Sequence, residues 1–389
     1  MTQTMFTEPE ERDALRDAVK KLAGKYGREF VEKQAREGGK MTEMWLEMGR
    51  AGFLGVNIGE EYGGGGGGMA DLAAVLEESA TVGAPLLLMV VSPAICGSII
   101  SRCGTEEQKQ RWLPGIADGT HLMAFGITEA DAGSNSHQIT TTATRDGDSW
   151  VLKGQKTFIS GVDEAQSVLI VARTEDAKTG KLKPALFVLP TDAEGFTKQP
   201  IPMSWEAPEK QFTLFLDDVR LPADALIGDE DGGLWQLFAG LNPERIMGAA
   251  MSCGMARYAL NKATAYAKER VVWKDQPIGA HQGIAHPLAK AKIELEQARL
   301  LWQKAAALYD AGDDMTAGEY ANMAKYAGGE IACNATDVAV HTHGGNGLTQ
   351  EFGLGNMLLA ARLGRIAPVS REMILNFVAM HSLGLPKSY

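Results

Sequence analysis

The spacing of apolar residues changes twice along the chain and predicts three zones of different structure. Up to about residue 121, apolar side chains recur at the i, i+3, i+4 spacing that is typical of amphipathic helices. From about residue 122 to 228 the period becomes two, as in half-buried strands. After Gly232-Gly233 the helical period returns in long, Ala-rich segments. The chain is therefore expected to run from helices through strands to helices.

The two helical zones can be divided further. In the first zone, one apolar face at helical spacing is formed by Leu15, Val19, Leu22, Tyr26 and Phe30. Two more helices are expected at residues 41–52 and 69–82. The last zone holds four long segments that favour a helical bundle, at residues 234–268, 286–311, 316–340 and 369–383.

The strand zone contains runs rich in β-branched and aromatic residues, which begin at Trp150, Ser167, Ala185 and Phe212. Because helices do not alternate with these strands, a small antiparallel sheet or barrel fits better than a doubly wound sheet. We therefore expect a mostly α-helical protein with a central β domain. Its parts would be an N-terminal helical domain at residues 1–121, an antiparallel β-barrel at 122–230 and a four-helix bundle at 231–389.

Charge and cysteine content exclude several classes of protein. The net charge of −11 argues against general nucleic-acid binding. The four cysteines show no C-x-x-C spacing, so we expect buried thiols in a reducing compartment rather than disulfides or zinc ligands. The amphipathic, charged N-terminal segment does not resemble a signal peptide. These features lead us to expect a soluble cytoplasmic protein.

The longest apolar stretch, residues 81–100, has about the length of a membrane-spanning helix. It is interrupted by glycines and prolines, among them Gly83 and Pro93. We therefore expect two buried helical pieces joined at Pro93 and no association with a membrane.

Six consecutive glycines, Gly63–Gly68, form a second unusual segment. The run resembles a phosphate-binding loop only loosely, since no Lys-Ser/Thr pair follows it. A flexible loop is the expected structure.

A carboxylate stands directly beside a guanidinium at Glu244-Arg245. The preceding Asn242 can cap a helix N-terminus, and Pro243 suits the first helical position. The pair can be a structural ion pair, which is common near helix starts, or a tuned general base with its electrostatic neighbour. The local pattern favours the ion pair.

A series of motifs, in this order and spacing, resembles the acyl-CoA dehydrogenase family over nearly the whole chain. The motifs are Glu60–Gly64, Gly104–Gly115, Phe125–Asn135, Leu152–Ser160, Glu269-Arg270, Gln276–Gln282 and His343–Gly347. The resemblance implies three domains of the kinds given above, usually in a homotetramer that is a dimer of dimers. It also implies FAD as cofactor and α,β-dehydrogenation of an acyl-CoA to the trans-2-enoyl-CoA. The electrons would pass to an electron-transferring flavoprotein.

The resemblance also assigns roles to individual residues. Those expected to bind FAD are Phe125, Ile127, Thr128, Phe158, Ser160, Arg270, Trp273, Gln282, His341, Gly344, Gly345 and Ser370. Those expected to bind the acyl-CoA are Ser134, Asn242 and Arg245.

Structural explanations stay open for several of these positions. Gly344 and Gly345 can form a helix C-cap. Trp273 can be a core residue, and Ser134 a turn residue. His341 and His343 have the spacing of a strand-borne metal pair, but no third ligand is near, so no metal is expected.

The usual catalytic base of the family is absent. An ungapped count from the Gly-Gly-x-Gly motif places Pro368 at that position, and proline cannot accept a proton. Two branches of the family, the isovaleryl-CoA and long-chain acyl-CoA dehydrogenases, carry the base immediately before an Arg. Glu244 with Arg245 matches this pattern. Glu351 and Glu372 are weaker candidates for the base.

The resemblance then implies a mechanism in which Glu244 removes a proton from Cα while a hydride leaves Cβ for the flavin. In relatives a backbone N–H at the base position supports the thioester carbonyl, but Pro368 has none. Either Val369 N–H or a flavin ribityl hydroxyl would take over, or the chemistry differs, as in an oxidase or a desulfinase. A non-catalytic acyl-CoA-binding relative is a further alternative. The missing glutamate leaves room for a branched or bulky acyl group, with residues 86–100 as the pocket floor.

Overall fold

The computed structural model describes residues 8–176, 179–230 and 232–387. Contacts divide the chain into two compact units, and each is built from separate stretches of sequence. One, the bundle unit, comprises Met1–Glu37, Gly68–Leu86 and Arg245–Tyr389. The other, the sheet unit, comprises Gly38–Gly67 and Leu87–Glu244. The expected order of helices, strands and helices is confirmed, whereas the domain boundaries near residues 121 and 230 stay predictions.

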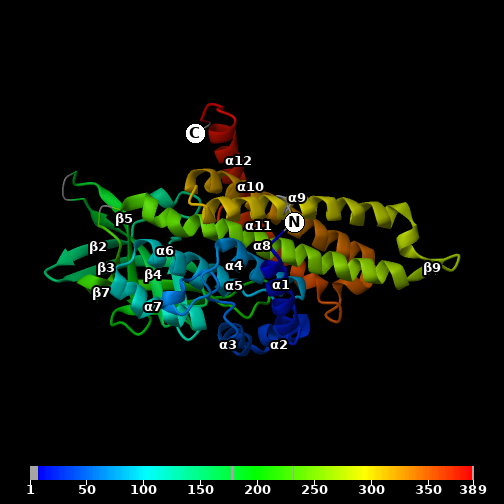
Figure 1. Cartoon of the computed structure of the whole chain (residues 1–389), viewed down its shortest axis with the longest axis horizontal. Coiled ribbons are helices and arrows are strands. Elements are labelled where there is room, and N and C mark those ends of the chain that lie inside the picture. Colours follow the sequence, from blue (N-terminus) through cyan, green and yellow to red (C-terminus); the bar gives the residue numbers. More distant parts are fainter. Residues whose placement is uncertain (1–7, 177–178, 231, 388–389) are drawn as a thin grey trace. The chain divides into compact units, whose positions relative to one another are not determined.

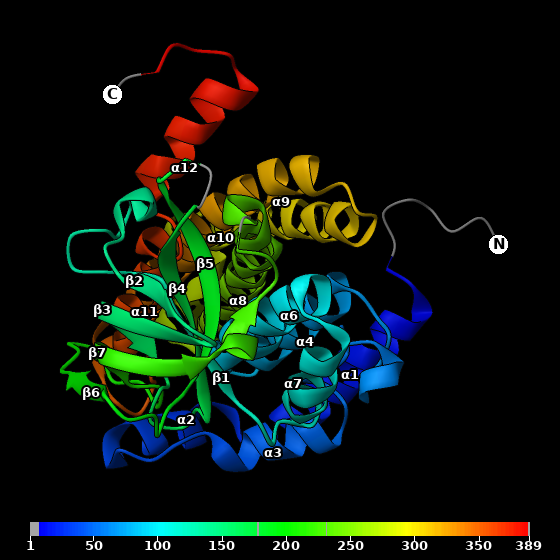
Figure 2. The ribbon, with the colours of Figure 1, turned by 90° about the vertical axis from the view of Figure 1, so that its left-hand side faces the viewer.

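Eight strands of the sheet unit form one sheet in the order β6-β7-β3-β2-β4-β5-β8, with β1 beside β4 (Figure 2). Neighbours are antiparallel except for β1 with β4 and a single parallel pairing of β2 with β4. The strands are β1 Met123–Gly126, β2 Thr142–Asp146, β3 Ser149–Ser160, β4 Ser167–Glu175, β5 Leu182–Pro190, β6 Phe196–Ile201, β7 Gln211–Pro222 and β8 Leu226–Ile227.

Apart from the first part of α8 (Gly233–Glu269), up to Glu244, the main helices of the sheet unit lie before the sheet in sequence. They are α3 Thr42–Arg50, α5 Leu87–Met89, the π-helix η2 Val90–Gly97, α6 Ser98–Cys103 and α7 Glu106–Asp118. The expectation of two pieces joined at Pro93 is wrong, because helical structure continues from Leu87 to Cys103 with Pro93 inside η2. A wider π turn accommodates a residue that cannot donate the regular backbone hydrogen bond. Within the described ranges, no helix is long and apolar enough to cross a membrane.

The bundle unit combines N-terminal helices with the long helices of the last zone (Figure 1). They are α1 Glu10–Ala23, α2 Gly27–Glu37, α4 Met69–Thr81, α8 Gly233–Glu269 from Arg245 onwards, α9 Gln282–Asp310, α10 Asp314–His343, α11 Leu354–Ile366 and α12 Arg371–Phe377. The first amphipathic pattern covers two helices, α1 and α2, and Gly27 begins the second with φ +64°. Helix α11 was not expected from the sequence. Helix α12 projects away from the other helices of the unit (Figures 1 and 2).

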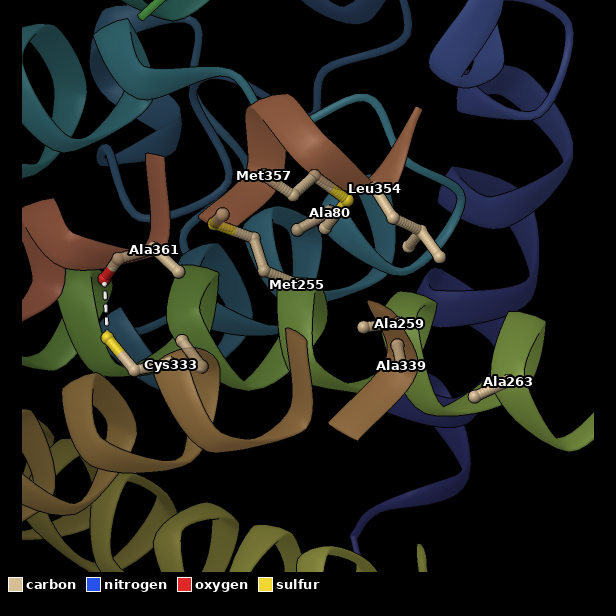
Figure 3. Close-up of a cluster of buried hydrophobic side chains, with 10 residues drawn as sticks. Ala80, Met255, Ala259, Ala263, Cys333, Ala339, Leu354, Met357 and Ala361 are labelled. Carbon is tan, nitrogen blue, oxygen red and sulfur yellow. Dashed lines mark hydrogen bonds between the residues drawn. The ribbon is translucent and has the colours of Figure 1, made fainter. Parts of the chain in front are cut away.

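Small side chains dominate the core of the bundle unit. Figure 3 shows one buried cluster, in which the sulfur of Cys333 on α10 donates to the carbonyl of Ala361 on α11 at 3.3 Å. Alanines let helix backbones approach closely, and flexible methionines fill the remaining space. The cluster consists of Ala80, Met255, Ala259, Ala263, Ala332, Cys333, Ala339, Leu354, Met357 and Ala361.

A buried charge network ties α1 to α4, α8 and α9 within the bundle unit. Arg16 of α1 donates to Glu77 at 2.7 Å and to Glu78 at 2.8 Å. Arg299 of α9 donates to Glu77 at 2.7 Å, and Arg257 of α8 to Glu78 at 2.7 Å. Such a network is costly to break, because removing one partner leaves an uncompensated buried charge.

The glycine run is ordered, so the expectation of a flexible loop is wrong. Gly65, Gly66 and Gly67 donate backbone hydrogen bonds of 2.8–3.0 Å to residues 55–58. A Cβ on Gly64 would lie 2.2 Å from the carbonyl oxygen of Ile58, so only glycine fits there.

Candidate active site

Glu244 and Arg245 lie in the interior of α8, not at its start. The helix begins at Gly233 and contains Pro243, so the expectation that Asn242 caps the helix is wrong. The apolar segment before Asn242 continues the helix, although proline cannot donate a backbone hydrogen bond. Asn242 is buried, whereas Glu244 and Arg245 are half-buried.

The first part of α8 packs on η2 and α6 within the sheet unit. A Cβ on Gly240 would lie 2.7 Å from the Ile99 side chain and 2.9 Å from that of Ile95. Cys96 of η2 is buried, and its burial and the charge of Glu244 both raise the pKa of its thiol. The charge of half-buried Glu244 therefore acts on the buried thiol of Cys96.

The loop that holds Pro368 packs against α8 within the bundle unit. The loop Ala367–Ser370, hereafter the Pro368 loop, connects α11 to α12. A Cβ on Gly248 would lie 3.8 Å from Pro368 Cδ, so loop and helix are in contact there. Gly248 follows Glu244 by one helical turn and shares its face of α8. The turn of α8 that holds Gly248 thus meets the Pro368 loop within the bundle unit.

The two competing carboxylates lie in a different environment. Glu351 is exposed, in a turn before α11. Glu372 is exposed in the first turn of α12, where Arg371 lies 3.3 Å away. Both carboxylates are solvated, which does not suit a base that must act where water is excluded.

The structure joins the two motifs of the sheet unit that were expected to hold the cofactor. Phe125 is buried in β1, and Ile127 and Thr128 follow it half-buried. The backbone N–H of Thr157 in β3 donates to the carbonyl of Thr128 at 2.9 Å. The end of β1 and the middle of β3 therefore form one continuous edge.

Phe158 is held in an unusual conformation on this edge. Its φ is +56°, and the register between β3 and β7 shifts between Lys156 and Ile159. An aromatic residue in the left-handed region is rare and strained, and such strain is often found at functional sites. The bulge leaves the ring 57% exposed. Nearby, half-buried Ser160 donates to Gln211 Oε1 at 3.0 Å. The bulge thus presents a flat apolar surface that a ring system can cover.

Sequence reasoning missed the buried pair beneath this edge. The Lys156 ammonium is fully buried and lies 2.8 Å from Glu129 Oε1 and 3.2 Å from the Ile127 carbonyl. Burial lowers the pKa of Lys156 to about 8. Burial opposes ionisation of Glu129 too, but hydrogen bonds from Lys156 and Thr141 lower its pKa to about 2. Glu129 and Lys156 both lie inside the family motifs, close in sequence to the expected cofactor residues Thr128 and Phe158. That closeness was the signal that could have identified them.

The remaining expected cofactor residues lie in the bundle unit, mostly at its surface. Trp273, at the end of β9 Val271–Trp273, is 71% exposed, so a core role is excluded in this chain. Arg270 precedes this strand, and exposed Gln282 begins α9. The pairing of β9 with β10 Gln276–Pro277 makes a small hairpin. Trp273 and Arg270 are therefore accessible to a ligand or a second chain.

The end of α10 carries three more positions of this set, His341, Gly344 and Gly345. Gly344 has φ +60° and caps α10, so the C-cap interpretation is confirmed. Gly345 follows it and is exposed. The idea of a strand-borne histidine pair is wrong, because His341 and His343 both lie on the helix. His341 is exposed, whereas His343 is buried and stacks on Tyr266 at 4.3 Å.

Two further residues take local structural roles. Ser370 is the N-cap of α12 and accepts a hydrogen bond from Met373 N–H at 3.3 Å. Ser134 is exposed in the loop that follows the bridge between Glu129 and Ala132. Ser370 and Ser134 stay predictions as ligand contacts.

Family models match three successive parts of the chain. They are described as acyl-CoA dehydrogenase, N-terminal domain (residues 9–120), middle domain (124–219) and C-terminal domain (231–383). The chain is 63% identical to acyl-CoA dehydrogenase FadE12 of Mycobacterium tuberculosis over 389 residues, which is 100% of each protein.

Solved structures are similar along nearly the whole chain as well. A glutaryl-coenzyme A dehydrogenase in complex with glutaryl-CoA is 30% identical, with a TM-score of 0.92 over 99% of this chain and 98% of that one. A glutaryl-CoA dehydrogenase of Mycobacterium smegmatis in complex with FADH2 is 26% identical, with a TM-score of 0.89 over 98% and 96%.

Proposed function

The chain belongs to the acyl-CoA dehydrogenase family of FAD-dependent oxidoreductases, and from this premise we propose that it forms a 2,3-double bond in an acyl-CoA thioester with Glu244 as base. The observation that carries the choice of base is the contact between α8 and the Pro368 loop. Proline replaces the usual carboxylate, and the neighbouring turn of α8 supplies another.

The residues present fit a flavin. Phe158 offers an exposed aromatic wall, and Ser160 and Thr128 add hydroxyl groups on the same edge of the sheet unit. In the bundle unit, Arg270 suits a diphosphate, since a guanidinium binds phosphate oxygens as a fork. Exposed Gly345 lets a ligand approach the backbone. When bound, FAD would accept the two electrons that the substrate loses.

In the proposed mechanism, Glu244 is the general base. Its carboxylate takes the proton from Cα, so the reaction starts from the ionised form of Glu244. The apolar side chains of η2 and α6 limit access of water to this part of α8. A base in such a place can contribute about 10²–10⁴-fold to the rate.

The thioester carbonyl gains negative charge as the proton leaves, so it needs a donor. Pro368 has no N–H, but the next residue does. Within the part of the chain that the structure describes, Val369 N–H donates to no other group, and Val369 is half-buried. We assign the donor role to Val369 N–H.

Anaerobic titration of the FAD-containing protein with an acyl-CoA tests the proposed function. Bleaching of the flavin absorbance is expected because the substrate delivers two electrons. Slow reoxidation of the bleached protein in air supports a dehydrogenase, whereas fast reoxidation identifies an oxidase. No bleaching by any acyl-CoA in a broad panel would contradict the proposal.

For the acyl group we propose a branched or bulky chain, because Pro368 leaves the space of a glutamate side chain empty above Cα. Residues 86–100 are the proposed floor of the acyl pocket, and the apolar side chains of Leu88, Met89 and Ile95 are buried there. The same panel tests this choice, and a preference for straight medium-length chains would refute it.

The proposed partners follow the family. They are an electron-transferring flavoprotein as acceptor and further copies of this chain in a homotetramer. Light scattering of the purified protein and reduction kinetics with that acceptor test the two parts separately.

A further inference from the structure

Side chains of α10 fix the Pro368 loop, and the mechanism above does not use them. The Lys325 ammonium donates a hydrogen bond to the carbonyl of Val369. Lys325 is only 2% exposed, so the charge is withdrawn from water. Burial of an ammonium is expensive, and the structure places this one on the carbonyl of the residue proposed as donor.

A carboxylate five residues further along α10 holds the two ends of the loop. Glu330 accepts from Arg365, at the end of α11, at 2.8 Å. Its other oxygen lies 3.1 Å from Arg371, at the start of α12. The contacts of Lys325 and Glu330 therefore fix the loop in its middle and on both sides.

Helices α10 and α11 pack closely, and this short separation allows Lys325 and Glu330 to contact the loop. A Cβ on Gly329 would lie 2.2 Å from the carbonyl oxygen of Gly364. Gly329 directly precedes Glu330 and follows Lys325 by one turn, so the short helix separation brings Lys325 and Glu330 to the loop. A shift of α10 or of the loop would break the buried contact of Lys325 and the half-buried ion pairs of Glu330.

We propose that Lys325 is a positioning residue for the reaction: by fixing the Val369 carbonyl it holds Val369 N–H where the thioester carbonyl arrives. This rests on the proposed dehydrogenation. A displacement of about 1 Å at a reacting group can cost about 100-fold in rate. Lys325 acts through the loop backbone and need not touch the substrate.

The test compares Lys325→Met with Lys304→Met in the full-length, FAD-containing protein. Methionine keeps most of the apolar stem and removes the ammonium. Lys304 is an exposed lysine of α9, with its ammonium 3.9 Å from the Tyr320 ring, and serves as control. Lys325→Met is expected to slow flavin reduction by about 30- to 100-fold with the acyl-CoA Kd changed less than about threefold. Lys325→Arg should recover most of the rate.

Hydrogen–deuterium exchange provides a readout independent of turnover. Amides of residues 367–371 should exchange at least about tenfold faster in Lys325→Met than in Lys304→Met. If Lys325→Met does not fold, Lys325→Gln replaces it, since its amide is too short to reach Val369. Unchanged reduction and unchanged exchange in a folded variant would overturn the inference. Failure of the unmodified protein to be reduced would instead overturn the proposed function.

Discussion

Phe158 shows how much one residue of the site depends on its backbone. A family motif is enough to predict an aromatic residue at the flavin, but not the bulge that turns its ring to the surface at φ +56°. Lys156 and Glu129 were missed for a related reason. A sequence does not show whether a charged residue is buried, and Lys156 and Glu129 compensate each other's charge in their buried position.

The exposed ring of Phe158 should matter for cofactor binding and little for stability. Phe158→Ala is expected to weaken FAD binding by about tenfold, since aromatic contacts contribute about 0.5–1.5 kcal/mol beyond their buried area. The free energy of unfolding of the apoprotein should change by less than about 0.5 kcal/mol. Fluorescence titration and thermal unfolding measure the two effects. Phe215→Ala, at a 37% exposed phenylalanine of β7, is the control and should retain FAD normally.

The Glu129 carboxylate should make the protein sensitive to acid. Its pKa is lowered from 4.5 to about 2, so its contribution to stability is fully present above pH of about 5 and is lost as the pH falls towards 2. In Glu129→Gln this part of the pH dependence should disappear. The same variant should lose about 3 kcal/mol at neutral pH, because buried Lys156 loses its partner. Urea unfolding between pH 3 and 7 measures both; an unaltered acid slope would disprove the role of Glu129.

At the scale of elements, period and composition predicted the long helices well and their ends poorly. Asn242-Pro243 is a valid start signal, yet α8 continues for nine residues before Asn242 because its first turns pack on η2 and α6. The same difficulty applies to α11, whose short amphipathic pattern lies between glycine-rich and proline-containing segments. Tertiary packing determined both outcomes, and a local pattern does not contain it.

The close contact of α10 with α11 predicts that replacing Gly329 lowers the stability of the protein. Gly329→Ala should lower the free energy of unfolding by about 2–3 kcal/mol, because its Cβ would lie 2.2 Å from the Gly364 carbonyl oxygen. Gly248→Ala is the matched control on α8, where the nearest atom is 3.8 Å away. It should be neutral or stabilising by up to about 1 kcal/mol. Equal thermal stabilities of the two variants would argue against the close approach.

At the scale of the whole molecule, the N-terminal zone is shared between the two units. Helices α1, α2 and α4 belong to the bundle unit, and α3 and α5–α7 to the sheet unit. The zone looks uniform in sequence because all its segments are helical in period. The division of this zone between the two units depends on long-range contacts, such as those of Arg16 with Glu77 and Glu78. The spacing of residues along the sequence does not predict such contacts.

The buried charge network should contribute strongly to the stability of the bundle unit. Arg16→Met removes one cation and leaves Glu77 and Glu78 undercompensated, at an expected cost of about 3–5 kcal/mol. Arg36→Met is the control, because this 41% exposed arginine lies 3.9 Å from Glu32 and should contribute less than about 1 kcal/mol. Thermal unfolding compares the two variants, and similar melting temperatures would rule out a stabilising network.

The central claim is that Glu244 has replaced the missing base. The most direct measurement is the rate of anaerobic flavin reduction by an acyl-CoA in Glu244→Gln, beside Glu351→Gln and Glu372→Gln. Glu244→Gln should retain FAD and bind the acyl-CoA, but reduce the flavin about 10²–10⁴-fold more slowly, while both controls react normally. Near-normal reduction in Glu244→Gln, or a comparable loss in either control, would contradict the account.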